Sequence, residues 1–487
     1  MRSRILLSIG CALLTASALA QNTWDKISAE ALKTPTLETN LQTLTDQVGG
    51  RVPGTPAMDK AIKWGLDAFR AAGAENVHVE PFEIQKSWSE GSTRFNITAP
   101  VNFRVRAVSF GWSPALERPL DASVVYLGAG TLEDFRNAGD VKGAILVVNT
   151  DLLKTWDDLF NEYLKAPPIV AAAVKAKAGA LAFISSREHD ILYRHIHTAH
   201  GEIDALPLLV IAREDGERIA RLTASGKSLS GEIVMPNNIG GPLTTANVVA
   251  EIKGSEKSDE YVVLGAHLDS WELGTGALDN GCNAALVIDA LRTIKAAGLR
   301  PKRSIRFILF SGEEQGMLGS WAYVKQHRDE MDRIAGVVIF DEGTGRATGF
   351  SIGGRADAEK ALERLLAPLA GWSANTLTND AVWGTDHDDF LLEGVPTLVA
   401  NQEEANYLVN YHATSDTFDK VDMPQLKKHV AIAAYAAFAI ADNPERIAPR
   451  QTRAEIEELM RRTKFDEQMK GFEAWDDWAS GHRGRAK

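Results

Sequence analysis

Short apolar segments typical of buried strands alternate with segments of helical spacing from residue 248 onward, and this alternation constrains the fold most strongly. The expected strands are Tyr261 to Ala266, Ser304 to Phe310, Gly336 to Phe340 and Pro396 to Ala400, and the expected helices are Asn283 to Ala297, Ser320 to Arg328 and Pro424 to Ala441. The alternation predicts an α/β protein with a mostly parallel, doubly wound sheet that helices cover on both faces. Functional groups should lie past the carboxyl ends of its strands.

A second group of strand-like segments predicts a smaller domain inserted at residues 119–240. These segments are 123–127, 144–148, 180–184 and 208–211, and glycines and an Ala/Lys-rich helical stretch separate them. The insert divides the larger domain into a first part at residues 21–118 and a second part at residues 241–445. Residues 446–487 form a C-terminal helical extension, in which apolar residues at helical spacing between 453 and 469 predict one amphipathic helix.

The first twenty residues have the pattern of a cleaved secretory signal peptide. Arg2 and Arg4 precede an apolar stretch, and Ala18-Leu19-Ala20 offers a small-residue cleavage site. The apolar stretch is too short to span a bilayer, so we expect a secreted or periplasmic protein with no stable membrane span. Cleavage leaves Cys282 as the one cysteine, so no intramolecular disulfide is expected.

The composition is that of a globular protein with an acidic surface. The 487 residues are 45% hydrophobic and 24% charged, which is enough for a large core. The net charge is −12, and loss of Arg2 and Arg4 with the leader makes it −14. This balance argues against nucleic-acid binding, which needs a basic face. The sequence leaves homodimerisation open.

Five polar stretches follow predicted strands or lie in adjoining loops. They are His267-Leu268-Asp269, Asp279-Asn280-Gly281, Glu313-Glu314, Asp341-Glu342-Gly343 and Tyr411-His412. Any one of them is more often a solvated loop or a helix cap than a set of ligands. Together they are informative, because the strands before His267, Glu313 and Asp341 are expected to be neighbours whose ends meet at one edge of the sheet. Two histidines and three carboxylates suit zinc, and a shared carboxylate can hold two ions about 3.5–4 Å apart.

The segment from His267 to Thr417 resembles the family of co-catalytic zinc aminopeptidases and carboxypeptidases. The resemblance is carried by His267-Leu268-Asp269-Ser270-Trp271, Gly276-Ala277-Leu278-Asp279-Asn280-Gly281, Leu299-Arg300-Pro301-Lys302-Arg303, Glu313-Glu314-Gln315-Gly316 and Gly384-Thr385-Asp386. It implies a sheet of the zinc exopeptidase type. It extends more weakly over the insert, which is similar to a protease-associated domain, and does not include the C-terminal extension.

Carried over residue by residue, the resemblance implies that the protein binds two zinc ions. His267 and Asp341 would hold one ion, and Glu314 and His412 would hold the other. The Asp279 carboxylate would bridge both ions. The resemblance thus assigns two imidazoles and three carboxylates to one metal centre.

Four further residues receive roles from the resemblance. Glu313 would be the general base, which must lie near the metals without being captured by them. Asp269 would accept the second ring N–H of His267 and fix its tautomer. Tyr411 matches the position at which some relatives place a phenol that stabilises the oxyanion. Asp386 would bind the substrate amino group or support a ligand, or else belong to a capped turn before the next helix.

The insert contains a second group of potential ligands, His195, His197 and His200. Their spacing resembles that of a metal site. No acidic cluster accompanies them in the sequence, so we expect a polar loop, and such a loop could line the entrance of the active site.

These observations predict an exported di-zinc exopeptidase that hydrolyses short peptides or dipeptides through a metal-bound water activated by Glu313. Similar sites serve aminopeptidases, carboxypeptidases and dipeptidases, so the direction of attack stays open. One alternative is a transferase like the glutaminyl cyclases, which share this fold but use a single zinc. The other is a non-catalytic, receptor-like binding protein. The presence of Glu313 and of all five ligand positions favours hydrolysis.

Overall fold

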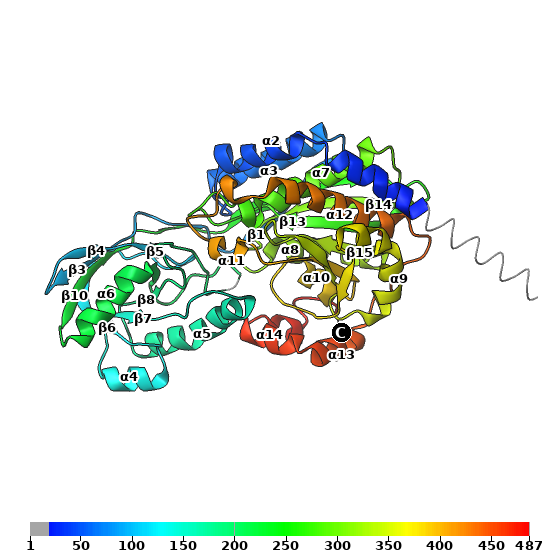
Figure 1. Cartoon of the computed structure of the whole chain (residues 1–487). Helices are drawn as coiled ribbons and strands as arrows, with labels where there is room; N and C mark the ends of the chain where they lie inside the picture. Colours follow the sequence, from blue (N-terminus) through cyan, green and yellow to red (C-terminus); the bar gives the residue numbers. More distant parts are fainter. Residues whose placement is uncertain (1–18, 199, 487) are drawn as a thin grey trace, which may run out of the picture.

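The computed structural model describes residues 19–198 and 200–486, and in these residues the chain forms two eight-stranded sheets (Figure 1). The larger sheet and its helices lie on the right of Figure 1, and the second sheet lies on the left. Residues 19–31 are helical. The predicted signal peptide, residues 1–20, falls outside the described residues except at its last two positions.

The larger sheet is mixed, with four parallel strands at its centre. Its strands in spatial order are β1 (Glu75–Ile84), β12 (Leu243–Ile252), β14 (Arg303–Phe310), β13 (Lys257–His267), β15 (Ile334–Ile339), β18 (Thr397–Gln402), β16 (Ala347–Ser351) and β17 (Thr376–Thr378). Strands β14, β13, β15 and β18 run parallel, whereas β12 and β16 run antiparallel to the central strands beside them.

Antiparallel strands at the edges depart from the mostly parallel sheet that the sequence predicts. For β12 the cause is the length of its connection. Only residues 253–256 separate β12 from β13, which lies on the far side of β14. A link of this length reverses the chain, so β12 runs antiparallel to β14, with which it pairs; a parallel strand would need a long crossover.

Helices cover both faces of the larger sheet. One face carries α2 (Thr36–Gln42), α3 (Pro56–Ala71), α7 (Cys282–Ala296) and α12 (Met423–Asp442), with α9 (Ala356–Leu366) packed against α12, and the other carries α8 (Leu318–Gln326) and α10 (His387–Leu392). Because successive strand residues point to opposite faces, Val262 and Leu264 lie in the core with α7 and α12, whereas Val263 packs with Tyr323 and Phe390.

The second sheet includes residues that the sequence assigned to the larger domain. Its order is β4 (Phe103–Val105), β3 (Arg94–Ala99), β10 (Leu229–Val234), β6 (Leu120–Tyr126), β7 (Ile145–Val148), β8 (Ala180–Ile184), β9 (Leu208–Ile211) and β5 (Ala107–Ser109), with helices α4 (Leu132–Ala138), α5 (Trp156–Lys175) and α6 (Arg213–Ala224). Strands β3, β4 and β5 precede residue 119, the start of the predicted insert. The chain passes from the larger sheet to the second sheet after β1 and returns before β12. The two connecting segments pair with each other as β2 (Trp88–Ser89) and β11 (Asn238–Ile239).

The C-terminal extension forms three short helices that pack on the larger sheet's helices. They are α13 (Arg453–Thr463), α14 (Phe465–Gly471) and α15 (Trp475–Ser480). The single helix predicted over 453–469 is interrupted because Lys464 takes a left-handed conformation with φ of 59°. Ile456 and Trp478 are buried in one cluster with Trp383 and Leu392, so the extension is part of the core.

No helix among residues 19–198 and 200–486 is long and apolar enough to cross a membrane.

We expect that Arg483 anchors the extension through a buried ion pair. Its Nε and Nη2 atoms lie 2.7 and 2.8 Å from the two carboxylate oxygens of Asp389. Arg483→Met should lower the free energy of unfolding by about 3–5 kcal/mol, because Asp389 is left buried without its partner. Urea unfolding measures the change. Arg461→Met, which breaks an exposed pair with Glu458, is the control and should cost less than about 1 kcal/mol; equal losses would contradict the anchor.

Candidate metal centre

Three neighbouring parallel strands deliver the first group of candidate residues to one edge of the larger sheet. β13 ends at His267, β14 ends three residues before Glu313, and β15 ends two residues before Asp341. Because β13 lies between β14 and β15, these side chains emerge side by side. His267, Glu313 and Asp341 each place a ligand-type atom within 4.8 Å of the others.

Asp279 lies between the two histidines of the centre. The Nε2 atom of His267 is 3.3 Å from Asp279 Oδ1 and 2.9 Å from Asp341 Oδ1. The Nε2 atom of His412 is 3.3 Å from Asp279 Oδ2 and 2.8 Å from Glu314 Oε2. The five predicted ligands therefore form two groups, and each Asp279 oxygen faces one group.

Both imidazoles make the hydrogen bonds that are typical of a histidine that binds a metal ion. Nδ1 of His267 lies 3.0 Å from the main-chain oxygen of Asp269, and Nδ1 of His412 lies 2.9 Å from that of Arg194. Since a carbonyl only accepts, each Nδ1 is the donor, and in a neutral ring Nε2 then carries a lone pair. These lone pairs face carboxylate oxygens, an arrangement that a bound cation stabilises.

The carboxylates also have the environment that a cation site requires. Asp279 Oδ2 and Glu314 Oε1 are buried and have no hydrogen-bond partner among the described residues. Burial raises the pKa of Glu314 to about 7. Imidazole nitrogens and carboxylate oxygens in these numbers suit zinc, so the residues present fit the metal that the sequence implied.

Glu313 differs from Glu314 in its position. Both residues line the cavity, but Glu313 is less buried, and its carboxylate lies within 4.8 Å of ligand-type atoms of His267 and Asp341. Burial raises its pKa well above the usual range for a glutamate, and the carboxylates of Asp341 and Glu314 act in the same direction. A carboxylate with raised proton affinity beside a metal centre can take and release a proton.

Asp269 contacts other groups than the sequence suggested. Its main-chain oxygen, not its carboxylate, is the hydrogen-bond acceptor for His267, whose Nδ1 is 3.7 Å from Asp269 Oδ1. The carboxylate accepts the main-chain N–H groups of Glu313 and Glu314 at 3.2 and 3.3 Å. Asp269 therefore orients the loop that carries Glu313 and Glu314.

Tyr411 and Asp386 have different surroundings. Tyr411 lines the cavity, and its ring stacks on His412 with centroids 3.7 Å apart. Asp386 is fully buried and does not line the cavity. Burial raises the pKa of its carboxyl group well above the usual range. The contact of Asp386 with substrate stays a prediction.

Two buried residues that sequence reasoning missed hold the loop of Asp279. The Asp416 carboxylate accepts the main-chain N–H groups of residues 277–279 at 3.1, 2.7 and 3.1 Å. The Arg51 guanidinium donates to the main-chain oxygens of Leu268, Thr275 and Gly276 at 2.6, 2.8 and 2.9 Å. Asp416 lies four residues after His412, and this position could have indicated that it belongs to the site. Nothing near Arg51 in the sequence indicated its role.

The histidines of the insert do not converge on one point. His195 lies 3.2 Å from Glu162, His197 lies 2.7 Å from Asp204 and His200 lies 2.9 Å from Asp477. Each ring has its own acidic partner, which agrees with the expected polar loop. All three histidines line the cavity.

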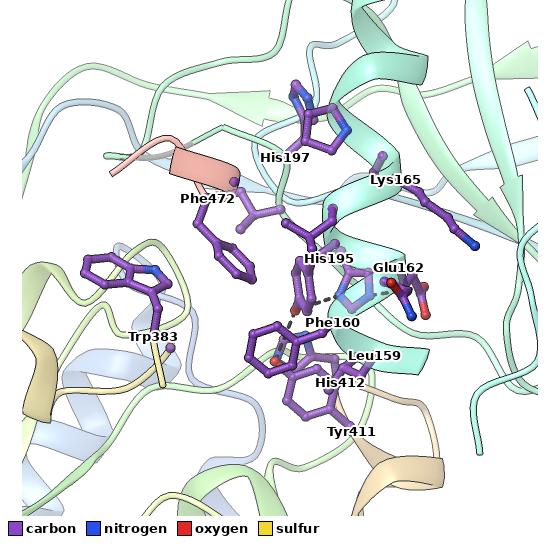
Figure 2. Close-up of a pocket in the computed structure, with 18 of the residues that line it drawn as sticks. Leu159, Phe160, Glu162, Lys165, His195, His197, Trp383, Tyr411, His412 and Phe472 are labelled. Carbon is purple, nitrogen blue, oxygen red and sulfur yellow. Dashed lines mark hydrogen bonds and ion pairs between the residues drawn. The ribbon is translucent and has the colours of Figure 1, made fainter. Parts of the chain in front are cut away.

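The metal centre opens into a cavity of about 1170 Å³. The insert, the larger sheet's loops and the C-terminal extension all contribute to its walls. Figure 2 shows Phe160 of α5, Phe472 and Trp383 around it, with Tyr411 and His412 at its base. A cavity of this volume can hold a small organic ligand.

Comparison with known proteins identifies the chain's relatives. The model of peptidase family M28 matches residues 247–437. Carboxypeptidase Q of Rattus norvegicus is 30% identical over 405 residues, which cover 82% of this chain and 84% of the relative. The crystal structure of a peptidase M28 precursor from Shewanella amazonensis SB2B is 25% identical with a TM-score of 0.82, over 90% of this chain and all of that one. A zinc aminopeptidase from Bacillus subtilis shares the fold with a TM-score of 0.65 at 20% identity, over 86% of this chain and 97% of that one.

The protein is a zinc metallo-exopeptidase. The chain belongs to peptidase family M28. The resemblance stated from the sequence motifs is therefore confirmed.

We expect Asp416→Asn to weaken zinc binding by about 10-fold to 100-fold, because the loop that presents Asp279 loses its charged acceptor. Competition with a chromogenic chelator measures the affinity. Asp419→Asn is the control, since Asp419 is exposed on the same segment. Equal zinc affinities of the two variants would show that Asp416 does not organise the site.

Proposed function

We propose that the protein is a di-zinc exopeptidase. The observation that carries this proposal is the position of Asp279, with one carboxylate oxygen toward each histidine. His267 and Asp341 would hold one ion, Glu314 and His412 would hold the other, and the Asp279 carboxylate would serve both. When bound, zinc polarises the scissile carbonyl and lowers the pKa of water enough for attack at neutral pH.

The chain's own residues supply the proton transfer and the geometry. Glu313 takes a proton from the attacking water and passes it to the leaving amine. Asp269 holds Glu313 in place through the main-chain N–H. Tyr411 donates a hydrogen bond to the oxyanion as it forms. The imidazoles keep their orientation through the main-chain oxygens of Asp269 and Arg194.

We extend the proposal to the domains and the destination of the chain. The second sheet is a protease-associated-like domain inserted into the peptidase domain, and the extension after residue 445 closes one wall of the cavity. The mature chain begins after residue 20 and works outside the cytoplasm. Short peptides and dipeptides are its substrates, because the insert and the extension enclose the metal centre.

Glu313→Gln should lower kcat by about 100-fold to 10,000-fold, because the amide cannot take the proton of the attacking water. Hydrolysis of peptides followed by mass spectrometry measures the rate, and metal analysis should give two zinc ions per chain for both proteins. The control is Glu359→Gln, which alters an exposed glutamate of α9. Undiminished turnover by Glu313→Gln would remove it as the base.

Peptides with one blocked end distinguish the direction of attack. Loss of hydrolysis on blocking the N-terminus alone indicates an aminopeptidase, on blocking the C-terminus alone a carboxypeptidase, and on blocking either end a dipeptidase. Cyclisation of peptides with an N-terminal glutamine, together with one zinc ion per chain, would instead indicate the glutaminyl-cyclase-like transferase. Peptide binding without any product would indicate a receptor-like protein.

A further inference from the structure

A chain of side-chain hydrogen bonds connects the insert to Tyr411. Glu162 Oε1 lies 3.2 Å from His195 Nε2, and His195 Nδ1 lies 3.1 Å from the Tyr163 hydroxyl. The Tyr163 hydroxyl lies 3.0 Å from that of Tyr411. Figure 2 shows Glu162, His195 and Tyr411 together in the cavity, with dashed lines marking these interactions. Three of the four side chains belong to the insert.

Several buried contacts hold the far end of this chain. The Glu162 carboxylate also accepts hydrogen bonds from the hydroxyls of Tyr193 and of Ser186, the latter at 2.7 Å, and lies 3.6 Å from the Arg187 guanidinium. The side chains of His195 and Glu162 are only 5% and 10% exposed. Hydrogen bonds in such a shielded network are stronger and more directional than bonds in water.

The near end reaches the metal centre. The Tyr411 ring stacks on His412, which fixes the plane of the ring. The Tyr163 ring lies against both the His195 ring and Phe472, with centroids 4.5 and 5.8 Å apart. The contact of 3.0 Å with the Tyr163 hydroxyl holds the Tyr411 oxygen in place, so the position of the phenol depends on the insert. Tyr163 is the donor in this contact when Tyr411 gives its own proton to the oxyanion.

Attachment of the insert does not require this side-chain network. The main-chain N–H of Arg194 donates to the oxygen of His412 at 3.0 Å, and that of Thr414 donates to the oxygen of Leu192 at 2.8 Å. Together with the bond from His412 Nδ1 to Arg194, these contacts already join the insert to the loop of the metal ligand. The side-chain network is therefore additional to the main-chain contacts that join the insert to this loop.

We propose that Glu162, His195 and Tyr163 are positioning residues that hold the Tyr411 hydroxyl in its catalytic orientation, so that the insert completes the active site. This inference rests on the proposed function, because it needs Tyr411 to act during peptide hydrolysis. It adds that the rate of this enzyme depends on side chains outside the peptidase sheet.

The test is a double-mutant cycle on the full-length zinc-loaded protein. Tyr411→Phe should lower kcat by about 100-fold, as loss of an oxyanion donor does. Tyr163→Phe should lower kcat by about 3-fold to 10-fold, the effect of one hydrogen bond, with KM changed less. In the double variant, the Tyr163 substitution should have no further effect, since its action passes through Tyr411. Tyr126→Phe, elsewhere in the insert, is the control and should keep the wild-type rate.

A second pair of variants guards against a merely structural effect. His195→Asn keeps a polar atom near the position of Nδ1 and should retain more activity than His195→Leu. Zinc content should match the wild type in both. Thermal unfolding identifies any His195 variant that has lost its fold. In that case the double-mutant cycle of Tyr163 and Tyr411 tests the inference.

The outcomes separate this inference from the proposed function. If the wild type hydrolyses peptides and the Tyr163 and Tyr411 effects are additive, or Tyr163→Phe matches the wild type, the inference is wrong and the proposed function stands. If Tyr411→Phe leaves kcat unchanged, the inference is overturned as well. A zinc-loaded wild type that hydrolyses no peptide overturns both.

Discussion

The concentration of negative charge at the carboxyl edge of one sheet is the constraint on which the rest of the structure depends. Asp279, Glu314 and Asp341 are brought together with two imidazoles whose Nδ1–H groups are already used. Carboxylates buried this closely repel one another unless a cation lies among them. Metal binding is therefore part of what stabilises this edge of the fold, and an exported chain with one mature cysteine would have no disulfide to do so.

The sequence predicted the parts of this arrangement that depend on local pattern. The apolar strands before His267, Glu313 and Asp341 could be recognised because each is a short run buried on both faces, and parallel neighbours end at the same edge. Asp279 and His412 lie in loops, and only their motifs indicated them. The role of Arg51 could not be predicted, because Arg51 donates to main-chain oxygens that lie more than two hundred residues away in the sequence.

Other differences arise where tertiary contacts override local signals. The strands at residues 94–109 join the second sheet because β10 and β9 offer them unpaired edges, which no local pattern reports. Lys464 interrupts an amphipathic pattern so that two short helices can follow the curved surface around Trp383. Asp386 matches a family motif, yet the turn that begins α10 buries its side chain. A motif thus identifies a residue without stating which way it faces.

The hydrogen bond between His412 and Arg194 links metal binding to the packing of the two sheets. Residues 192–194 and 412–414 pair through their main chains, which joins the loop of His412 to the insert. His412 itself has a φ of 58°, a conformation unfavourable for a residue with a Cβ atom. The surrounding contacts must compensate for this strain. The insert is therefore joined to the loop of His412, and the cavity lies at the junction that this pairing creates.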